Sequence, residues 1–341
     1  MTWNSMIRGV AIGDAYGNPN EFRNIGTLTK NDPRGPELPE SLIITDDTQM
    51  TLALAEALDA SREASVAETQ DAIIKAFLGY YSDPDNDGKR APGVTVMGSL
   101  AKLNRGTPWY QATSRTSDGS GTVMRTSPVA FVADDRWVGV AAFAAAVTHG
   151  TANAIAAAIL NVAVLRAALR GEVEPGNTVA LALAMASDPE QYGLLNVGEW
   201  LDDYPIDLKP GFDELSRLLS IAFLSLPNLL SDPWARNSDP SRLIGGGGWR
   251  AHETLVIALL AADMFPGDPW EALRRSVTTD GDSDTIGAVA GAILGALYPG
   301  YTWPDVLDRM EPRYARWIAE SDDYRFAPAK RSWWQRLLQL Q

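Results

Sequence analysis

Two short segments of the chain place a pair of carboxylates beside a threonine, a combination that can bind a divalent cation. Residues 45–48 read TDDT and residues 281–287 read GDSDTIG, and each segment leads into an apolar helical pattern. One carboxylate is enough to cap a helix, whereas two neighbouring carboxylates repel each other unless a cation lies between them. Carboxylate and hydroxyl oxygens are the ligands that Mg²⁺, Mn²⁺ and Ca²⁺ prefer. On spacing alone, metal binding and ordinary helix capping both stay open.

The composition restricts any metal site to oxygen ligands. The chain has 341 residues with no Cys and only two His, which excludes a thiolate site and argues against a site built from several histidines. Its formal net charge is −14, so it lacks the basic surface that a nucleic-acid partner requires. A small anionic ligand is still possible where helix N-termini and a few Arg side chains meet it.

Helical periodicity dominates the chain, with apolar residues recurring at i, i+3, i+4 and i+7, while alternating strand patterns are scarce. The predicted helices are 5–17, 47–61, 66–81, 93–104, 137–148, 151–170, 176–186, 250–264, 284–298 and 303–318. We predict one all-α domain over residues 1–320 and a tail over residues 321–341. Residues 331–338 could form a short amphipathic helix docked on the domain, with a partner or a membrane surface as the alternative.

The chain carries no recognisable targeting or membrane signal. Its first fourteen residues lack the basic region, apolar run and cleavage site of a signal peptide. No apolar stretch reaches the roughly 20 residues that a membrane helix needs. We therefore expect a cytoplasmic protein without a membrane partner, and a monomer.

Two of the predicted helices carry three glycines each at a spacing of four residues. They are Gly9, Gly13 and Gly17 near the start of the chain, and Gly287, Gly291 and Gly295 near its end. This spacing puts the glycines on one face of each helix, where each costs about 1 kcal/mol relative to Ala. Close packing of backbone against backbone would offset that cost. We predict that the two helices are central and in contact.

Five ordered segments together resemble the ADP-ribosylglycohydrolase family, which includes the dinitrogenase-reductase-activating glycohydrolase and the ADP-ribosyl-arginine and ADP-ribosyl-serine hydrolases. The segments are GDAYGNPNEF (13–22), TDDTQMTLALAEAL (45–58), SGTVMR (120–125), GGGGW (245–249) and GDSDTIGAVAGAILGALYPG (281–300). The resemblance implies a compact orthogonal bundle of helices. Ser120, Thr122 and Pro299 depart from the family pattern, which puts loop detail in doubt but not the metal site.

The resemblance also implies a set of site residues. By position, the metal ligands would be Thr45, Asp46, Asp47, Asp282, Asp284 and Thr285, holding two Mg²⁺ ions or Mn²⁺. Glu21 would lie on the segment that family members close over the substrate. The leaving group must be protonated by a carboxylic acid, for which Glu21 and Asp284 are the catalytic candidates, or by a metal-bound water. The substrate-binding residues would be Gly119, Ser120, Gly121, Thr122, His149, Gly247, Gly248 and Trp249.

Several of these residues also have purely structural interpretations. The N–H groups of 119–122 and 245–248 suit a diphosphate, but a turn that feeds a helix would explain both segments. His149 is either a ligand-binding residue or a helix cap, and Arg125 pairs with either a phosphate or a structural carboxylate. Asp14 reads as a structural residue bonded to neighbouring backbone. The DPDNDG sequence at 83–88 lacks a twelfth-position acid and reads as a solvated acidic turn, and His252-Glu253 lacks the second His of a zinc protease.

Taken with the resemblance, these residues predict a metal-dependent hydrolase that removes ADP-ribose from a modified acceptor, with an arginine-linked acceptor as the first hypothesis. Its partner would be an ADP-ribosylated protein or a small ADP-ribosyl compound. The alternatives on the same fold are an immunity protein that neutralises an ADP-ribosylating toxin, by hydrolysis or by occlusion, and a non-catalytic ADP-ribose-binding protein. The complete set of oxygen ligands argues against the non-catalytic alternative.

Overall fold

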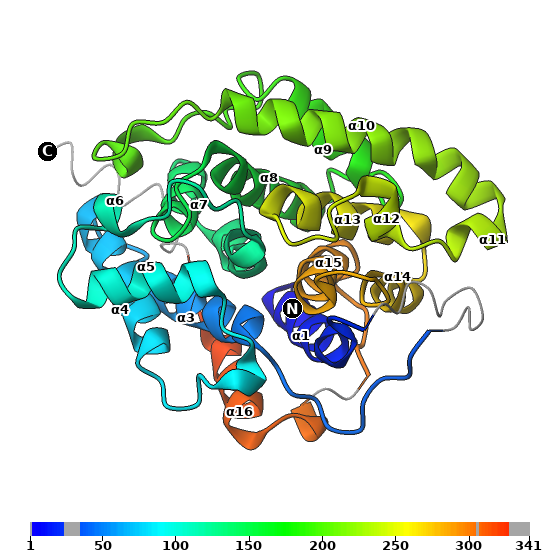
Figure 1. Cartoon of the computed structure of the whole chain (residues 1–341), viewed down its shortest axis with the longest axis horizontal. Coiled ribbons are helices and arrows are strands. Elements are labelled where there is room, and N and C mark those ends of the chain that lie inside the picture. Colours follow the sequence, from blue (N-terminus) through cyan, green and yellow to red (C-terminus); the bar gives the residue numbers. More distant parts are fainter. Residues whose placement is uncertain (1, 24–34, 305–306, 327–341) are drawn as a thin grey trace, which may run out of the picture.

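The computed structural model describes residues 2–23, 35–304 and 307–326. Within these ranges the chain consists of α-helices, short 3-10 helices and connecting segments, with three isolated bridges and no strand. Figure 1 shows that the helices cross one another at large angles and surround a few helices at the centre of the molecule. The prediction of an all-α fold is confirmed. The predicted helix at 331–338 lies outside the described residues.

The helices follow one another along the whole described chain. The α-helices are α1 Thr2–Gly17, α3 Asp46–Ala60, α4 Val66–Tyr81, α5 Val94–Asn104, α6 Trp109–Ala112, α7 Trp137–Ala146, α8 Ala152–Leu169, α9 Thr178–Ser187, α10 Lys209–Ser231, α11 Pro233–Arg236, α12 Pro240–Ile244, α13 Ala251–Met264, α14 Pro269–Ser276, α15 Ser283–Leu297 and α16 Pro312–Glu320. The 3-10 helices are η1 Asn18–Asn20, η2 Gly88–Arg90, η3 Ser120–Arg125, η4 Ser127–Phe131, η5 Gly198–Leu201, η6 Leu307–Arg309 and η7 Ser321–Asp323.

Helices α1 and α15 pack against each other with their glycines at the contact, as predicted. A Cβ atom built on Gly13 would lie 2.0 Å from the carbonyl oxygen of Gly287, and one on Gly9 would lie 2.1 Å from that of Gly291. These separations are too short for any side chain, so only glycine allows the two backbones to approach this closely. Figure 1 shows the pair at the centre of the molecule, with the start of the chain beside a segment that lies almost 300 residues later.

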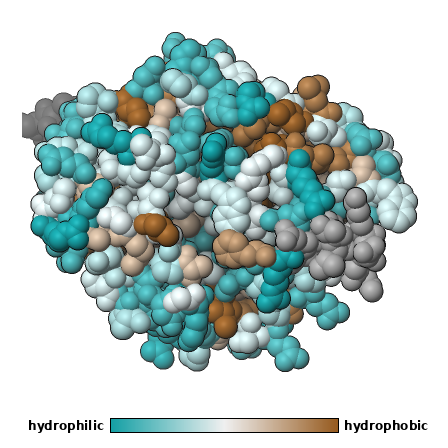
Figure 2. All heavy atoms as spheres, in the orientation of Figure 1, coloured by the Kyte–Doolittle hydropathy of each residue, from teal (hydrophilic) through white to brown (hydrophobic). Residues whose placement is uncertain are grey.

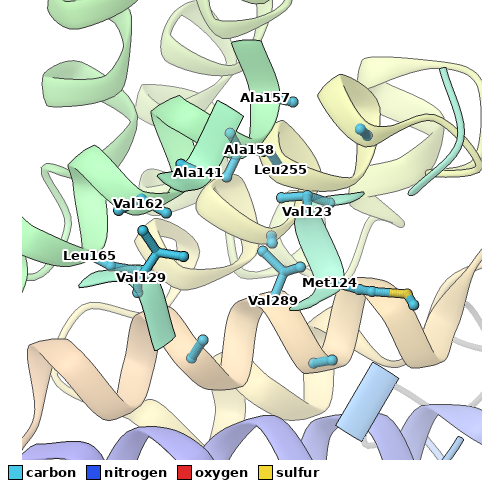
Figure 3. Packing of buried hydrophobic residues seen from close by; sticks show 14 of the residues in the cluster. Val123, Met124, Val129, Ala141, Ala157, Ala158, Val162, Leu165, Leu255 and Val289 are labelled. Atoms are coloured by element: carbon cyan, nitrogen blue, oxygen red, sulfur yellow. The ribbon is translucent and has the colours of Figure 1, made fainter. Parts of the chain in front are cut away.

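The core around this pair is built from small and branched side chains. Figure 3 shows Val123, Met124 and Val129 from the two consecutive 3-10 helices packed between residues of α8, α13 and α15. Helix α8 is the one described helix that is long and apolar enough to cross a membrane. However, 83% of it is buried among the other helices, which is the environment of a core helix. Alanines line much of its surface, so neighbouring helices approach closely.

Among the α-helices of eight or more residues, the structure differs from the sequence prediction in three. Helix α10, 23 residues long, was missed because Pro210 and Gly211 at its start and Pro227 inside it are typical of loops. Helix α14 was also missed. The predicted helix 303–318 is wrong, because α16 begins only at Pro312, after the 3-10 turn η6. Proline is favoured in the first turn of a helix, and Pro312 is the first residue of α16.

Helix α10 lies on the outside of the bundle and is amphipathic. Its buried face includes Phe212, Leu215, Leu219 and Leu226, spaced by three to seven residues. Its other face exposes apolar side chains such as Leu224. Figure 2 shows that hydrophilic side chains cover most of the visible face of the molecule, with brown areas toward the upper right, where Figure 1 places α10.

Candidate active site

Asp14 of α1 fixes the first turn of α3. Its carboxylate is fully buried and accepts hydrogen bonds from the N–H of Thr45 at 2.9 Å and of Thr48 at 3.1 Å, and from both hydroxyls. The predicted structural role is confirmed, but the predicted partners were wrong, because the bonded backbone lies 31 and 34 residues away instead of beside Asp14. The glycine contact holds α1 against α15. Asp14 therefore places the N-terminus of α3 next to that of α15.

The six residues predicted as metal ligands lie at these two helix N-termini and are all buried. They are Thr45, Asp46, Asp47, Asp282, Asp284 and Thr285. Two hydroxyls, one from each helix end, converge on Oδ2 of Asp47: that of Thr45 at 3.1 Å and that of Thr285 at 3.4 Å. The structure thus brings together two segments that are more than 230 residues apart in the sequence.

Backbone groups orient the remaining carboxylates of the cluster. Oδ2 of Asp46 accepts the N–H of Gly93 at 3.1 Å, and Oδ1 of Asp284 accepts the N–H of Thr285 at 2.9 Å. Asp282 is the N-cap residue of α15, yet its side chain makes no capping hydrogen bond. An ordinary N-cap Asp would accept a hydrogen bond from the helix backbone. The carboxylate of Asp282 does not, so it is available to bind a cation together with the other carboxylates.

The electrostatics of the cluster favour a bound cation. Burial and the neighbouring carboxylates raise the pKa of Asp47 well above its ordinary value, with Asp284, Asp14 and Asp46 as the strongest charged neighbours. Oδ1 of Asp47 is buried and accepts no hydrogen bond from the described residues. An acceptor left without a donor in such a place is costly unless a positive ion meets it. The residues present therefore fit a Mg²⁺ or Mn²⁺ site.

Glu21 adds a further carboxylate at the rim of the cluster. Carboxylate oxygens of Glu21, Asp282 and Asp284 all lie within 4.8 Å of one another. Glu21 follows η1, which ends the helical part of this segment, and its side chain is partly exposed. Partial burial, together with the charges of Asp284 and Asp46, raises the pKa of Glu21 to about 8.

An exposed aromatic pair joins the Glu21 segment to the glycine-rich loop. The rings of Phe22 and Trp249 stack with centroids 5.1 Å apart and planes 18° apart. Phe22 has a backbone φ of 62°, which a bulky residue seldom adopts, and 72% of its side chain is exposed. Stacking offsets part of that conformational cost. The pair holds Glu21 over the carboxylate cluster.

The two predicted substrate-binding loops meet each other and the cluster at Asp282. The N–H of Ser120 donates to the carbonyl of Trp249 at 3.1 Å, and the N–H of Asp282 donates to that of Gly247 at 2.9 Å. The Ser120 side chain also hydrogen-bonds the Asp282 carboxylate. Thr122 turns its hydroxyl away, toward the carbonyl of Ala154 in α8.

This geometry changes which backbone groups are available to an anion. The N–H group of Gly119 donates to Oγ of Ser117 and that of Ser120 donates to the carbonyl of Trp249, so these two groups are less available to an anion. The N–H groups of Gly246, Gly247 and Gly248 make no hydrogen bond to any described residue, and all three have positive φ angles near +80°. These three N–H groups are therefore available to an anion.

His149 and Arg125 lie beneath the 119–122 loop. His149 is buried against Gly119 and Gly121, and burial together with the charge of Arg125 lowers its pKa to about 3, so its ring is neutral. Arg125 was predicted to pair with a phosphate or a carboxylate, and neither prediction holds. It is fully buried and donates to the carbonyl of Ala144 at 2.7 Å and to the hydroxyl of Thr148 at 2.6 Å.

The match to known sequences agrees with this arrangement. The family model described as ADP-ribosylglycohydrolase matches residues 5–332. The chain belongs to the ADP-ribosylglycohydrolase family.

Relatives of this ADP-ribosylglycohydrolase family member include bacterial and animal proteins. It is 26% identical over 317 residues to the uncharacterized protein YegU of Escherichia coli (strain K12), with 86% of each chain covered. It is 26% identical over 328 residues to the ADP-ribosylhydrolase ARH3 of Homo sapiens, with 86% of this chain and 84% of the human chain covered. A solved structure from an ADP-ribosylglycohydrolase-related protein complex covers 96% of this chain with a TM-score of 0.64 and 25% sequence identity.

One supporting network in this family member was missed from the sequence. The acidic turn at 83–88 was predicted to be merely solvated, which is wrong, because Asp85 pairs with Arg90 at 2.8 Å and accepts the hydroxyl of Tyr314 at 2.6 Å. Arg90 is fully buried and donates to the carbonyl of Ile44, the residue before the first predicted metal ligand. No spacing rule links these residues, since α16 supplies Tyr314 from the far end of the chain.

The charge crowding in the cluster leads to a prediction about stability. In the presence of EDTA, Asp47→Asn is expected to raise the free energy of unfolding by an amount on the order of 1 kcal/mol, because an uncompensated buried charge is removed. The pKa of Asp47 is higher in the folded than in the unfolded protein. As the pH rises from the unfolded to the folded pKa, ionisation of Asp47 favours the unfolded state and lowers the free energy of unfolding. The gain in Asp47→Asn should therefore be larger at pH 8 than at pH 4.

Urea denaturation at both pH values measures this effect. Mg²⁺ should stabilise the wild-type protein but not Asp47→Asn. A variant that is less stable than wild type in EDTA at pH 8 would contradict the proposed charge crowding.

Proposed function

We propose that this protein is a metal-dependent hydrolase that releases ADP-ribose from a modified acceptor in the cytoplasm. The observation that carries the proposal is the convergence of six buried oxygen-bearing side chains, with Oδ1 of Asp47 lacking a hydrogen-bond partner, directly beside the Glu21 carboxyl group. The human relative named ADP-ribosylhydrolase supports the chemistry of the reaction. The set of side chains suits two Mg²⁺ ions, with Mn²⁺ as the alternative.

The bond to be cleaved is the glycosidic bond at the ribose carbon distal to adenine. Bound at the cluster, Mg²⁺ would supply Lewis-acid chemistry for the ribose hydroxyls and the attacking water. Thr45 and Thr285 orient Asp47, while the Gly93 and Thr285 N–H groups orient Asp46 and Asp284. Cleavage of this bond is expected to pass through an oxocarbenium-like transition state, as in other glycoside hydrolyses.

Glu21 is the better of the two candidate acids. Asp284 is buried inside the cluster and its Oδ1 accepts the N–H of Thr285, so it is committed to the ligand set. Glu21 is partly exposed at the rim, so its carboxyl group can exchange a proton with solvent. A rim carboxyl that carries a proton can deliver it to a leaving group that departs toward solvent.

Replacing Glu21 tests this assignment. Glu21→Gln is expected to lower kcat by roughly 10²-fold or more, the scale of lost general-acid assistance, because the amide cannot donate and regain a proton. Affinity for Mg²⁺ should change much less than in Asp284→Asn. Glu63→Gln, on an exposed turn far from α15 in sequence, is the matched control and should behave as wild type.

Single-turnover measurements at saturating substrate separate this effect from binding. Wild-type turnover by Glu21→Gln would show that another group, such as a water molecule, protonates the leaving group.

The acceptor is proposed to be arginine, and one assay tests this together with the reaction. The protein is incubated with arginine-linked, serine-linked and nucleic-acid-linked ADP-ribose, with and without Mg²⁺, and the release of free ADP-ribose is measured. The proposal expects release from the arginine-linked substrate only when Mg²⁺ is present. Release from the serine-linked substrate alone would retain the hydrolase and replace the acceptor, while binding without release from any substrate would exclude a hydrolase.

A further inference from the structure

A buried chain of hydrogen bonds runs from Arg125 through Thr148 to His149. Nη2 of Arg125 lies 2.6 Å from Oγ1 of Thr148, which in turn lies 2.8 Å from Nδ1 of His149. All three side chains are buried, with at most 2% of each exposed. Arg125 also donates a hydrogen bond to the carbonyl of Ala144, and its guanidinium lies 4.7 Å from the centre of the Phe77 ring. These two contacts fix the position of the Arg125 side chain.

The direction of these hydrogen bonds follows from the chemistry of the groups. A guanidinium can only donate, so Oγ1 of Thr148 accepts from Arg125. The hydroxyl hydrogen of Thr148 then needs an acceptor. Among the described residues, the one other atom bonded to Oγ1 is Nδ1 of His149. If Nδ1 carried the hydrogen instead, the buried hydroxyl of Thr148 would be left without an acceptor, which is unfavourable.

The opposite side of the imidazole ring faces the loop at 119–121. A Cβ atom built on Gly119 would lie 2.9 Å from Nε2 of His149, and one on Gly121 would lie 3.3 Å from Cε1. Nε2 makes no hydrogen bond to any described residue, and it is not among the fully buried atoms that lack a partner. It is therefore available to a further hydrogen-bond partner beside this loop.

We propose that Arg125 and Thr148 are positioning residues that lock His149 in the tautomer with its hydrogen on Nε2, so that the ring presents a fixed, neutral N–H donor at the 119–121 loop. The ligand would be an acceptor oxygen of the ADP-ribose group, and this last step rests on the proposed function. A neutral donor that needs no change of protonation binds an anionic ligand equally well across the physiological pH range. The tautomer itself does not depend on the reaction.

Nitrogen NMR of the full-length protein measures the tautomer directly. The chain has only two His, so the ¹⁵N signals of His149 are assigned by difference with His252→Gln. At pH 7 the wild-type protein should show a protonated Nε2 and an unprotonated Nδ1 for His149. Thr148→Ser, which keeps the hydroxyl, should give the same pattern, whereas Thr148→Val should lose it. A protonated Nδ1 in the wild type, or an unchanged tautomer in a folded Thr148→Val, would overturn the proposal.

Titration with free ADP-ribose tests the role of the donor in binding. Thr148→Val should weaken ADP-ribose binding by about 10-fold, and Thr148→Ser should bind within about 2-fold of wild type. Equal affinity in all three proteins would overturn the binding role of His149. Absence of ADP-ribose binding in the wild type would instead contradict the proposed function, while the NMR result would stand on its own.

Discussion

Removal of divalent cations is expected to abolish hydrolysis, and Asp282→Asn is expected to lower kcat/KM by about 10³-fold or more even in excess Mg²⁺. Lewis-acid assistance contributes several kcal/mol to a transition state, and each 1.36 kcal/mol changes the rate tenfold. Asp282 is the residue to change, because its carboxylate caps no helix and is anchored only by Ser120 and the neighbouring cluster. Its replacement should therefore disturb the fold less than replacement of Asp14.

The measurement is the release of ADP-ribose before and after dialysis against EDTA, with Mg²⁺ or Mn²⁺ then restored. Asp280→Asn is the matched control, because Asp280 lies in the same loop but pairs with Arg242, whose side chain is 48% exposed, and not with the cluster. It should retain most of the activity. Full activity in a cation-free buffer would contradict the proposed mechanism, even if the protein proved to be an ADP-ribose hydrolase.

The largest effect on stability is expected at the contact between α1 and α15. Gly13→Ala should lower the free energy of unfolding by about 3 kcal/mol or more, because its Cβ would lie 2.0 Å from the carbonyl oxygen of Gly287 and 2.4 Å from the carbonyl carbon. Both atoms belong to backbone inside a helix, so the helices must separate. That movement would also shift Asp284 relative to Asp47, and activity should fall together with stability.

Gly98→Ala is the matched control for this prediction. Gly98 lies in α5, and a Cβ built on it meets no atom within 4 Å. The change should stabilise the protein by about 0.5–1 kcal/mol, because Ala is the better helix former. Urea denaturation of both variants gives the two values. If Gly13→Ala proved as mild as Gly98→Ala, the glycines would not be needed for the close approach of the two backbones.

Residue patterns along the chain were sufficient to predict the helical class, most helix positions and the acidic residues that lie together in the fold. Periodicity was sufficient where helices are long and uninterrupted, as in α4 and α8. It failed at α10, where residues typical of loops lie inside a helix whose apolar face is stabilised by tertiary packing. The glycine spacing predicted the contact between α1 and α15 because no other purpose of those glycines would offset their cost.

The hydrogen-bond partners of the site residues, in contrast, depend on how the helices pack. Spacing in the sequence could not show that Asp14 caps a helix that begins more than 30 residues later. Nor could it show that the N–H of Ser120 donates to the carbonyl of Trp249, or that Arg125 is buried and donates to Thr148. Each of these roles depends on which partner lies within about 3 Å, and that is set by how distant helices pack. A residue type defines what a group can donate or accept, whereas the fold defines the atom that it meets.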